Sequence, residues 1–353
     1  MNKTIAIISD FIGISEDNIY GGSETWILEI SKQFRKNGYY VFIFSPNTRW
    51  TLSNNIEYIP INYLEYFISH VKIDYTLIFR YILSNNLNIL SKYINNHNVY
   101  WICHDVVGMI DNKNLTLEMI QSNPWLSENL NKFICMSDFG KQCIQVNIPL
   151  PDDKFCIIGN GINFDYIPPI EDNERDNSFL WSSRYERGLK LFSEQIFPHI
   201  KEKYPDSKIY VAQYENYLPE EFLNNPDIVF LGSLNKHDLY KEMQKHKVYF
   251  YPNTFPETFC ITILEAILNG NDLITAFRHG PTTTLRLFQD SFLPPDYDFN
   301  EETNLYVANL IIDKIENYNN KDRVILRKIM INYIRNNYSW ENIYNQFKEK
   351  VLI

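Results

Sequence analysis

Short apolar runs rich in β-branched and aromatic residues alternate with helical patterns along the whole chain, and this alternation limits the possible folds more than any other feature. Five runs in the first half are typical of buried strands: Thr4–Ser9, Tyr40–Ser45, Thr76–Phe79, Val99–Cys103 and Lys132–Met136. Helical patterns lie between them, as in Ser23–Lys36, where Trp26, Ile30 and Phe34 recur at helical spacing. Strand followed by helix, repeated, predicts an α/β fold with a mostly parallel, doubly wound sheet.

The alternation is interrupted once and then restarts. The stretch 167–177 (IPPIEDNERDN) is rich in Pro, Asn and acidic residues and has no periodicity, which indicates a linker. After it, strand and helix patterns return at Phe179–Ser182, Leu189–Tyr204, Lys208–Ala212, Asp227–Leu231, His237–Lys245, Lys247–Tyr251, Thr262–Leu268 and Asp272–Ala276. At roughly 100–200 residues per domain, 353 residues suit two domains, which we place at 1–166 and 178–335. Ligands of such sheets bind outside the carboxyl ends of the strands, so two Rossmann-like domains facing across a cleft would carry their chemistry on loops that follow strands.

Charge and cysteine content exclude several classes of protein. The chain has 33 Lys and Arg against 43 Asp and Glu, a net charge of −10, whereas a nucleic-acid binder needs a basic surface. The five cysteines form no CxxC pair, which argues against a disulfide framework or a zinc site and fits a reducing compartment. The N-terminal apolar run is too short for a secretory signal, and no stretch approaches the ~18 apolar residues of a membrane span. We therefore expect a cytoplasmic protein without a transmembrane segment, whose oligomeric state stays open.

The segment 251–270 (YPNTFPETFCITILEAILNG) carries two carboxylates eight residues apart. Glu257 lies in a Pro-containing loop after a predicted strand, and Glu265 lies inside the helix that follows. If a phosphate sat at the start of that helix, each carboxylate could accept hydrogen bonds from hydroxyls on one side of it, as in a sugar–diphosphate–ribose ligand. The alternative is that Glu257 only favours the helix dipole and that Glu265 is solvated.

The start of this predicted helix is itself a candidate phosphate site. With Thr258 as N-cap, the amides of Phe259, Cys260 and Ile261 would be unpaired in the first turn. Such amides, together with the helix dipole, attract a phosphate.

Three cations follow another predicted strand, in the segment 179–190 (FLWSSRYERGLK). They are Arg184, Arg187 and Lys190. Guanidinium groups bind phosphate oxygens bidentately, and several converging cations would neutralise a diphosphate leaving group. The alternative is a solvated basic helix start, but cations there oppose the helix dipole, so an anion should compensate them.

Two weaker signals lie in the first half. Gly21 and Gly22, in the sequence GGSE before the first helix, let the backbone approach a ligand, although such a pair is more often only a loop. His104 and Asp105 follow the strand Val99–Cys103, at its carboxyl end. A lone His is more often structural than catalytic, and the adjacent Asp raises the odds of function only modestly.

Motifs of rival chemistries are missing from the sequence. It has no GxSxG elbow, no Walker A loop, no HExxH and no Rossmann fingerprint after the first strand. No DxD-type acidic pair follows a strand in a way that would hold a metal on a diphosphate. We therefore expect neither a metal nor a cofactor.

In their order along the chain, these segments resemble a glycosyltransferase of the GT-B fold, family GT4, the large retaining and nucleotide-sugar-dependent group. The resemblance covers nearly the whole chain and runs through GGSE, the HD after a strand, ICMSDFGK, GNGIN, SSRYERGL, VFLGSL, PETFCITILEA and SWENIYNQF. The Glu-x7-Glu pair in its FPETF…LEAILNG context is the most specific part.

The resemblance implies roles for the second-half residues. Glu257 would hold hydroxyls of the donor hexose and face the reacting centre, while Glu265 would hold the ribose. Arg184 would grip the diphosphate. The family usually has Lys-Gly a few residues later, so here either Arg187 or Lys190 would supply the second cation.

The resemblance also implies contacts from other segments. His104 would lie beside the donor sugar, and Gly22 would let the first loop approach the phosphate or the acceptor. The backbone near Ser233 and Leu234 would read the base edge. The final helix, 336–353, would return to the N-terminal domain.

Two departures from the family pattern affect the donor site. Cys260 stands where the family usually has Gly, which narrows the approach to the phosphate but leaves the backbone N–H available. Thr282–Thr284 stand where a second Gly and a Glu are often seen. Both changes bear on donor identity more than on the reaction.

The implied reaction transfers a hexose from a nucleotide diphosphate sugar to an acceptor hydroxyl of a glycan, with retention and without a metal. We favour a UDP-sugar over a GDP-sugar as the donor. The acceptor would be read by loops at 10–20 and 106–125, which carry no recognisable signal. Two alternatives stay open: a nucleotide-sugar epimerase on the same fold, and a non-catalytic nucleotide-sugar-binding subunit.

Overall fold

The chain forms two α/β units in the computed structural model. The structure describes residues 3–14, 21–47, 49–105, 120, 122–170, 174–213, 215–288, 291–293 and 299–352. Contacts group Met1–Gly161 with Trp340–Ile353 in the first unit, and Ile162–Ser339 in the second. The segment 162–166, predicted for the first domain, therefore lies with the second unit.

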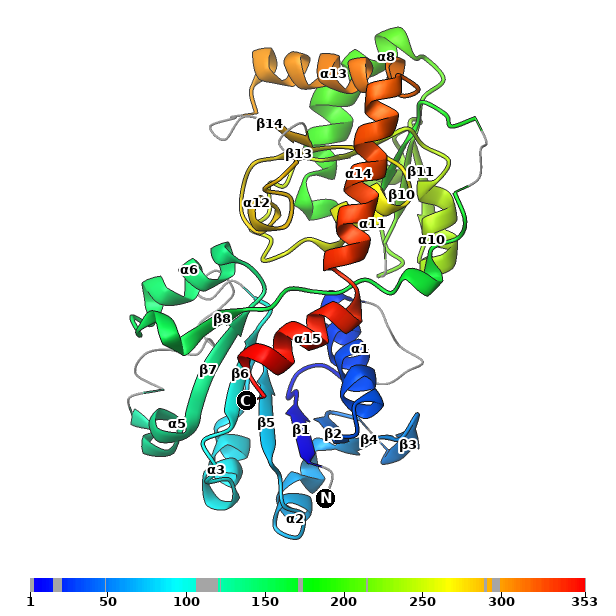
Figure 1. Ribbon diagram of the computed structural model, residues 1–353. Helices are drawn as coiled ribbons and strands as arrows, with labels where there is room; N and C mark the ends of the chain where they lie inside the picture. Colours follow the sequence, from blue (N-terminus) through cyan, green and yellow to red (C-terminus); the bar gives the residue numbers. More distant parts are fainter. Residues whose placement is uncertain are drawn as a thin grey trace. The chain divides into compact units, whose positions relative to one another are not determined.

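The first unit is built on one sheet with the strand order β3-β4-β2-β1-β5-β6-β7-β8 (Figure 1). Its strands are β1 (Thr4–Ile8), β2 (Tyr40–Ser45), β3 (Thr51–Ser53), β4 (Ile56–Pro60), β5 (Tyr75–Phe79), β6 (Val99–Cys103), β7 (Leu130–Cys135) and β8 (Phe155–Ile157). All neighbours pair in parallel except β3 and β4. The five predicted strands are confirmed. The sequence analysis missed β3, β4 and β8, of which β3 and β8 are only three residues long.

Helices cover both faces of this sheet. They are α1 (Gly22–Lys36), α2 (Leu64–Ile68), α3 (Ser84–Tyr93), α5 (Pro124–Asn129), α6 (Asp138–Asn147) and α15 (Trp340–Lys350), with 3-10 turns η1 (Ile61–Tyr63) and η2 (Asp152–Lys154). Ile78 of β5 belongs to the same apolar cluster as Phe67 of α2 and Leu87 of α3. The next residue, Phe79, meets the ring of Trp26 in α1. Because successive strand residues point to opposite faces, α2 and α3 cover one face and α1 covers the other.

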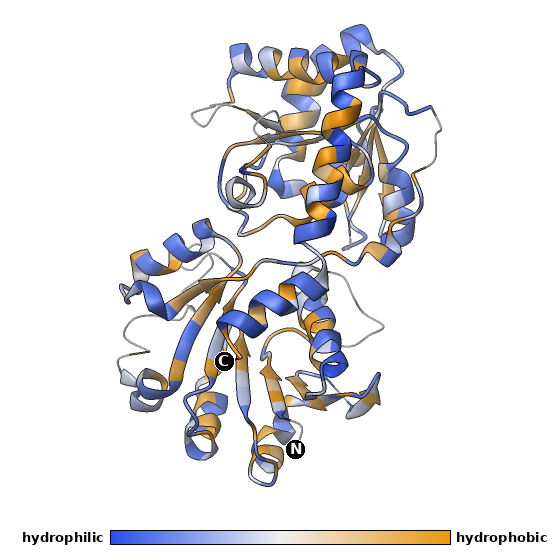
Figure 2. Cartoon of the chain, in the orientation of Figure 1, coloured by the Kyte–Doolittle hydropathy of each residue, from blue (hydrophilic) through white to orange (hydrophobic). Residues whose placement is uncertain are grey.

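The final helix belongs to the first unit. The ring of Phe347 in α15 contacts those of Trp26 and Phe34 in α1, at centroid distances of 6.3 and 5.3 Å. The Tyr100 hydroxyl of β6 donates to the carbonyl of Val351 at 2.7 Å. Figure 1 shows α15 beside α1, and Figure 2 shows apolar and polar residues alternating around α15.

The second unit has two three-stranded sheets, ordered β11-β10-β9 and β12-β13-β14, with every pair parallel among the described residues. The strands are β9 (Phe179–Trp181), β10 (Ile209–Ala212), β11 (Ile228–Gly232), β12 (Val248–Tyr251), β13 (Asp272–Ala276) and β14 (Phe292–Leu293). A bridge between Asp176 and His246, just before β9 and β12, joins the two sheets side by side. The hydroxyl of Ser182, the residue after β9, and that of Tyr249 in β12 add a 2.9 Å hydrogen bond.

Helices separate the strands of the second unit. They are α7 (Leu189–Leu191), α8 (Phe197–Lys203), α9 (Glu220–Leu223), α10 (Lys236–Met243), α11 (Ile261–Leu268), α12 (Pro281–Thr284), α13 (Glu301–Glu316) and α14 (Lys321–Asn337), with 3-10 turns η3 (Phe164–Tyr166) and η4 (Tyr185–Arg187). Of these, α10 and α11 lie at the predicted helical segments His237–Lys245 and Thr262–Leu268. The predicted single helix Leu189–Tyr204 is interrupted by a π-helical turn, η5 (Phe192–Ile196). Pro198 explains the interruption, because it has no N–H to continue the α-helical ladder.

The described part of the predicted linker is tied into the second unit. Arg175 is buried and donates hydrogen bonds to the carbonyls of His246 at 3.0 Å and Asn269 at 2.7 Å. The polar and acidic composition predicted a segment without regular structure, but composition could not show that its one arginine would bind two buried carbonyls.

Candidate functional site

The loop that leads from β12 into α11 differs from the sequence prediction at the helix start. Thr258 is not the N-cap: α11 begins at Ile261, and its N-cap is Cys260, in the left-handed conformation with φ of 66°. The first helical amides are therefore those that begin at Ile261, so Phe259 lies outside the helix. The left-handed conformation of Cys260 prevents the helix from starting earlier. The sequence offered Thr258 as an N-cap but gave no sign of this backbone conformation.

A second loop holds the segment before α11 in place. The N–H of Gly280 donates to the carbonyl of Glu257 at 2.7 Å. A Cβ added at Gly280 would lie 2.4 Å from the carbonyl carbon of Thr258, closer than any side chain tolerates. Only Gly therefore allows this approach, which fixes the backbone on either side of Glu257.

Glu257 is brought together with Arg187. The Glu257 carboxylate accepts a hydrogen bond from the Tyr251 hydroxyl at 2.9 Å and forms an ion pair with the Arg187 guanidinium. The Glu257 side chain is 13% exposed, and the guanidinium lies 4.7 Å from the centroid of the Phe255 ring. Burial and the neighbouring carboxylate raise the pKa of Tyr251 well above its usual value, so its hydroxyl stays a donor. A carboxylate, a guanidinium and a phenol thus meet at the carboxyl end of β12.

Glu265 lies in α11 and is almost fully buried, at 3% exposure. Its Oε1 accepts hydrogen bonds from Lys236 Nζ at 2.5 Å and from the Tyr240 hydroxyl at 2.8 Å, both from α10. Burial and Glu265 raise the pKa of Tyr240. The structure therefore contradicts the alternative in which Glu265 is merely solvated. The sequence analysis missed Lys236, since a lysine at the start of a surface-like helix carries no signal of a buried partner.

The other two cations of the segment 179–190 have different partners. Arg184 forms ion pairs with Glu186 at 3.1 Å and Glu215 at 3.4 Å, and its side chain is 39% exposed. Lys190 is 61% exposed and lies 3.8 Å from Glu221 of α9. Ion pairs this exposed contribute little stability, so both cations can exchange partners at small cost.

The backbone after β11, which the family resemblance places against the nucleotide base, adjoins the buried side-chain amide of Gln213. Leu234 is half-buried in the loop after Gly232, whose φ is 73°. The Gly232 carbonyl accepts a hydrogen bond from the backbone of Gln213, which follows β10. Among the described residues, neither amide atom of the Gln213 side chain has a hydrogen-bond partner, although the residue is only 5% exposed. An unsatisfied buried amide is costly, and no sequence pattern had singled it out.

In the first unit, Gly22 is the exposed first residue of α1, with Gly21 as N-cap. His104 follows β6 and packs against the rings of Trp26 and Phe79, at centroid distances of 5.7 and 4.8 Å. Burial, and then the charge of Arg80, lower the pKa of His104 to about 3. The imidazole is therefore neutral at physiological pH, and the place of His104 beside the donor sugar stays a prediction. Most of the predicted acceptor loops, 15–20 and 106–119, lie outside the described residues.

The described residues contain no metal-binding cluster and no helix suited to span a membrane. Nowhere in them do three or more His, Cys, Asp or Glu side chains gather in a way that could hold a metal ion. Of the helices that the structure describes, none has the length and apolar content to cross a membrane.

Comparison with solved structures shows the fold. The chain superposes on sucrose-phosphate synthase from Thermosynechococcus elongatus with a TM-score of 0.70 at 15% identity, covering 99% of this chain and 98% of that one. It superposes on a glycosyltransferase from Rickettsia africae with a TM-score of 0.73 at 16% identity, covering 99% and 98%. For the HepE protein of Anabaena in complex with UDP-glucose, the TM-score is 0.66 at 12% identity, covering 99% of both chains. No protein-family model and no curated protein matches the sequence. The predicted GT-B fold, with its two Rossmann-like units, is confirmed.

Proposed function

We propose that this GT-B chain is a retaining glycosyltransferase of the GT4 type, which moves a hexose from a nucleotide diphosphate sugar to an acceptor hydroxyl of a glycan. A UDP-sugar is favoured over a GDP-sugar as donor. The observation that carries the proposal is the cluster of Glu257, Arg187 and Tyr251 at the carboxyl end of β12, directly before α11. It combines a carboxylate that can bind sugar hydroxyls with a cation that can bind phosphate, at the edge of the sheet where ligands of this fold class bind.

The proposed role of these residues is to stabilise the negative charge that develops on the leaving phosphate. The bond from the anomeric carbon to the donor phosphate breaks as a bond to the acceptor oxygen forms on the same face. The acceptor proton passes to the leaving phosphate. Arg187, Arg184 and the first amides of α11 offset the charge on that phosphate, each contributing on the order of 2–4 kcal/mol to the barrier reduction. Because these groups are cationic or donors, the proposed reaction runs without a metal.

Arg187 can serve both partners at once. A guanidinium has five N–H donors in a planar fork, so a contact to Glu257 leaves donors for a phosphate oxygen. The ion pair orients the cation before the donor arrives, which reduces the reorganisation needed during reaction. In a double displacement, Glu257 itself would attack the anomeric carbon, and that route stays open. Glu265, oriented by Lys236, is assigned to the ribose hydroxyls.

The test is a panel of UDP-, GDP- and ADP-sugars in a thermal-shift experiment, repeated with EDTA and followed by product analysis. We expect a UDP-sugar to stabilise the protein, with EDTA changing neither binding nor turnover, and the product linkage to keep the donor's anomeric configuration. A changed sugar with the nucleotide still attached would establish an epimerase instead. Donor binding without turnover across a glycan acceptor panel would establish a binding subunit.

A further inference from the structure

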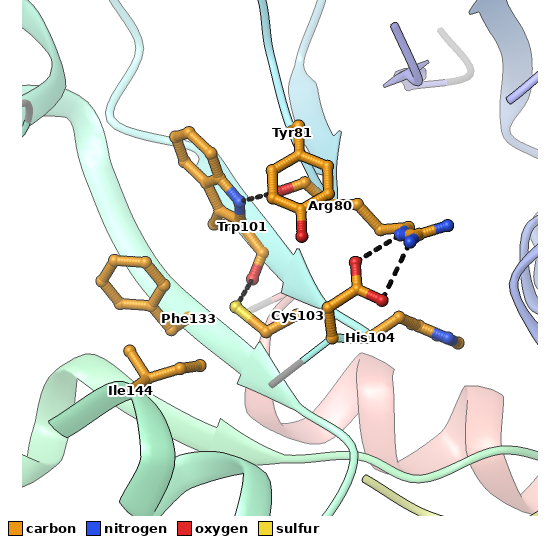
Figure 3. A pocket seen from close by; sticks show the side chains of 8 residues that line it. Arg80, Tyr81, Trp101, Cys103, His104, Phe133 and Ile144 are labelled. Atoms are coloured by element: carbon orange, nitrogen blue, oxygen red, sulfur yellow. Dashed lines mark hydrogen bonds and ion pairs between the residues drawn. The ribbon is translucent and has the colours of Figure 1, made fainter. Parts of the chain in front are cut away.

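A small pocket in the first unit lies where β5 and β6 end, and His104, which the family resemblance places beside the donor sugar, is part of its lining (Figure 3). Its inner wall consists of Trp101, Cys103, Phe133 and Ile144. Figure 3 shows Phe133 and Ile144 on one side of it and Tyr81 on the other. The free volume of about 20 Å³ is enough for one group the size of a water molecule or a methyl.

The inner wall favours a methyl over water. Its two polar groups already have partners: Trp101 Nε1 donates to the carbonyl of Arg80 at 2.9 Å, and Cys103 Sγ donates to the carbonyl of Trp101 at 3.7 Å. A buried water needs two to four polar partners, which this wall does not spare. An apolar group gains by leaving water for such a wall.

The rim, in contrast, offers a donor and an acceptor side by side. Arg80 Nε and Nη2 donate to the two oxygens of Asp105 at 2.5 and 2.9 Å. The two side chains are 26% and 18% exposed, and the bidentate pair leaves further guanidinium N–H groups and carboxylate lone pairs for a ligand. Arg80 has φ of 62°, a costly conformation for a residue with a Cβ, and its backbone N–H and carbonyl are held by Ile102 and Trp101. Strain of this kind is concentrated at binding sites.

An aromatic surface adjoins the rim. Phe11, which is 51% exposed, meets the ring of Tyr81 edge-on at a centroid distance of 5.9 Å. Burial and Asp105 raise the pKa of Tyr81 to about 12, so its hydroxyl remains protonated beside the carboxylate. Exposed aromatic rings next to paired charges suit the apolar C–H face of a sugar ring.

We propose that this pocket receives the acetamido group of an N-acetylated amino sugar. The methyl enters the apolar space, and the amide N–H, which points to the same side of a trans amide as the methyl, donates to Asp105. The assignment deepens the proposed function and rests on it, since the amino sugar is then either the acceptor or the donor hexose. A 6-deoxy sugar has the methyl without the adjacent N–H donor, a plain hydroxyl leaves the apolar space empty, and an acidic sugar meets the Asp105 carboxylate.

The direct test uses the full chain and two probes, methyl 2-acetamido-2-deoxy-β-D-glucopyranoside and methyl β-D-glucopyranoside, in saturation-transfer NMR titrations. The acetyl methyl protons should receive the strongest saturation. The acetamido sugar should bind at least about tenfold more tightly, because one buried methyl and one hydrogen bond together supply that factor. Equal affinities, or an acetyl methyl that receives no more saturation than the ring protons, would overturn the proposal.

Variants of the wall and the rim make the test independent of folding. Ile144→Val enlarges the pocket by one methyl and should shift preference toward the N-propanoyl analogue at least about threefold, a gain that unfolding cannot produce. Asp105→Asn should weaken the acetamido sugar and leave the plain glucoside unchanged. The control is Val146→Ala on the same helix, at an 84% exposed position, which should change neither preference. An unchanged acyl preference in Ile144→Val contradicts the proposal.

Two further experiments show whether the acetamido group belongs to the donor or to the acceptor. They also test this proposal separately from the proposed glycosyltransferase function. Turnover by wild type and Ile144→Val is compared with UDP-N-acetylglucosamine against UDP-glucose, and with acetylated against plain acceptors. If Ile144→Val changes the preference between the two donors, the pocket binds the donor sugar. If it changes the preference between acetylated and plain acceptors, the pocket binds the acceptor. Transfer without any acetamido preference refutes this inference alone. Acetamido binding without nucleotide-sugar binding refutes the proposed function alone.

Discussion

At the scale of single residues, the position of each chemical group depends on one or two contacts. Glu257 is held by Tyr251 and Arg187, whereas Lys190, only three residues from Arg187, lies with Glu221. Neighbouring cations of one segment therefore have quite different surroundings. The sequence identified which residue types could act but not which cation would meet the carboxylate.

Removal of either proposed donor contact should reduce turnover with little effect on folding. Glu257→Ala and Arg184→Ala should each lower turnover at least about a hundredfold, the scale measured for loss of one transition-state contact. Steady-state kinetics with the stabilising nucleotide sugar measures it. Glu202→Ala, at a 79% exposed side chain of α8, is the control. Wild-type rates in either variant would remove the site assignment.

Cys260 gives a stability prediction at the same scale. Its φ of 66° disfavours any Cβ, and a β-branched residue most of all. Cys260→Val should destabilise the protein by more than about 2 kcal/mol, whereas Cys260→Gly, which relieves strain but loses a buried thiol, should stay within about 1 kcal/mol of wild type. Urea unfolding of both variants tests this, and an equal loss in the two would show that the conformation carries no strain.

At the scale of elements, the second unit depends on contacts between loops as much as on its strands. Gly280 approaches the backbone of Thr258, and a Cβ at Gly188 would lie 2.8 Å from the ring of Pro252. The loops after β9, β12 and β13 are thereby packed together, and they include Arg187 and Glu257. Element types could be predicted from periodicity, but these approaches depend on backbone conformations that periodicity does not encode.

A buried histidine joins the two sheets of this unit and should make stability depend on pH. His246 is 1% exposed, with Nδ1 2.7 Å from Asp176 and Nε2 3.5 Å from Glu242. Burial lowers the pKa of His246, but the two carboxylates outweigh burial and raise it above 6.5. The stabilisation from protonated His246 is therefore complete below about pH 6.5 and is lost as pH rises through the raised pKa.

The measurement is the urea midpoint between pH 6 and pH 9. Wild type should lose stability over this range, and His246→Gln should be less stable at pH 6 with a flatter profile. His199→Gln, on the surface of α8, should keep the wild-type slope. A His246→Gln profile parallel to that of wild type would contradict the assignment.

At the scale of the whole molecule, the two units do not correspond to two continuous halves of the sequence, because the last helix belongs to the first unit. The last helix packs on α1 through Phe347, which is fully buried. Residues far apart in sequence thus share one core, while the groups assigned to the nucleotide, such as Arg187 and Glu265, belong to the second unit.

This division predicts that stability and nucleotide binding can be separated. Phe347→Ala should destabilise the first unit by about 3–5 kcal/mol, the usual cost of deleting a buried ring. UDP affinity, measured by calorimetry below the unfolding transition, should change less than about twofold, because the residues proposed to bind the nucleotide, Arg187 and Glu265 among them, lie in the other unit. Lys348→Ala, at an exposed position of the same helix, serves as control. A parallel loss of UDP affinity in Phe347→Ala would show that the units do not behave separately.

The alternation of apolar runs and helical periods is a local property, so the sequence alone determined the α/β class, most strands, and the place of Glu257 and Arg187 on loops after strands. Tertiary structure decided the rest: that Arg187 meets Glu257, that Lys236 meets Glu265, that α11 begins at Ile261, and that Arg80 pairs with Asp105 beside an apolar pocket. Each of these depends on how segments far apart in the chain pack, and a distance between such segments is set by the folded backbone and not by any local pattern.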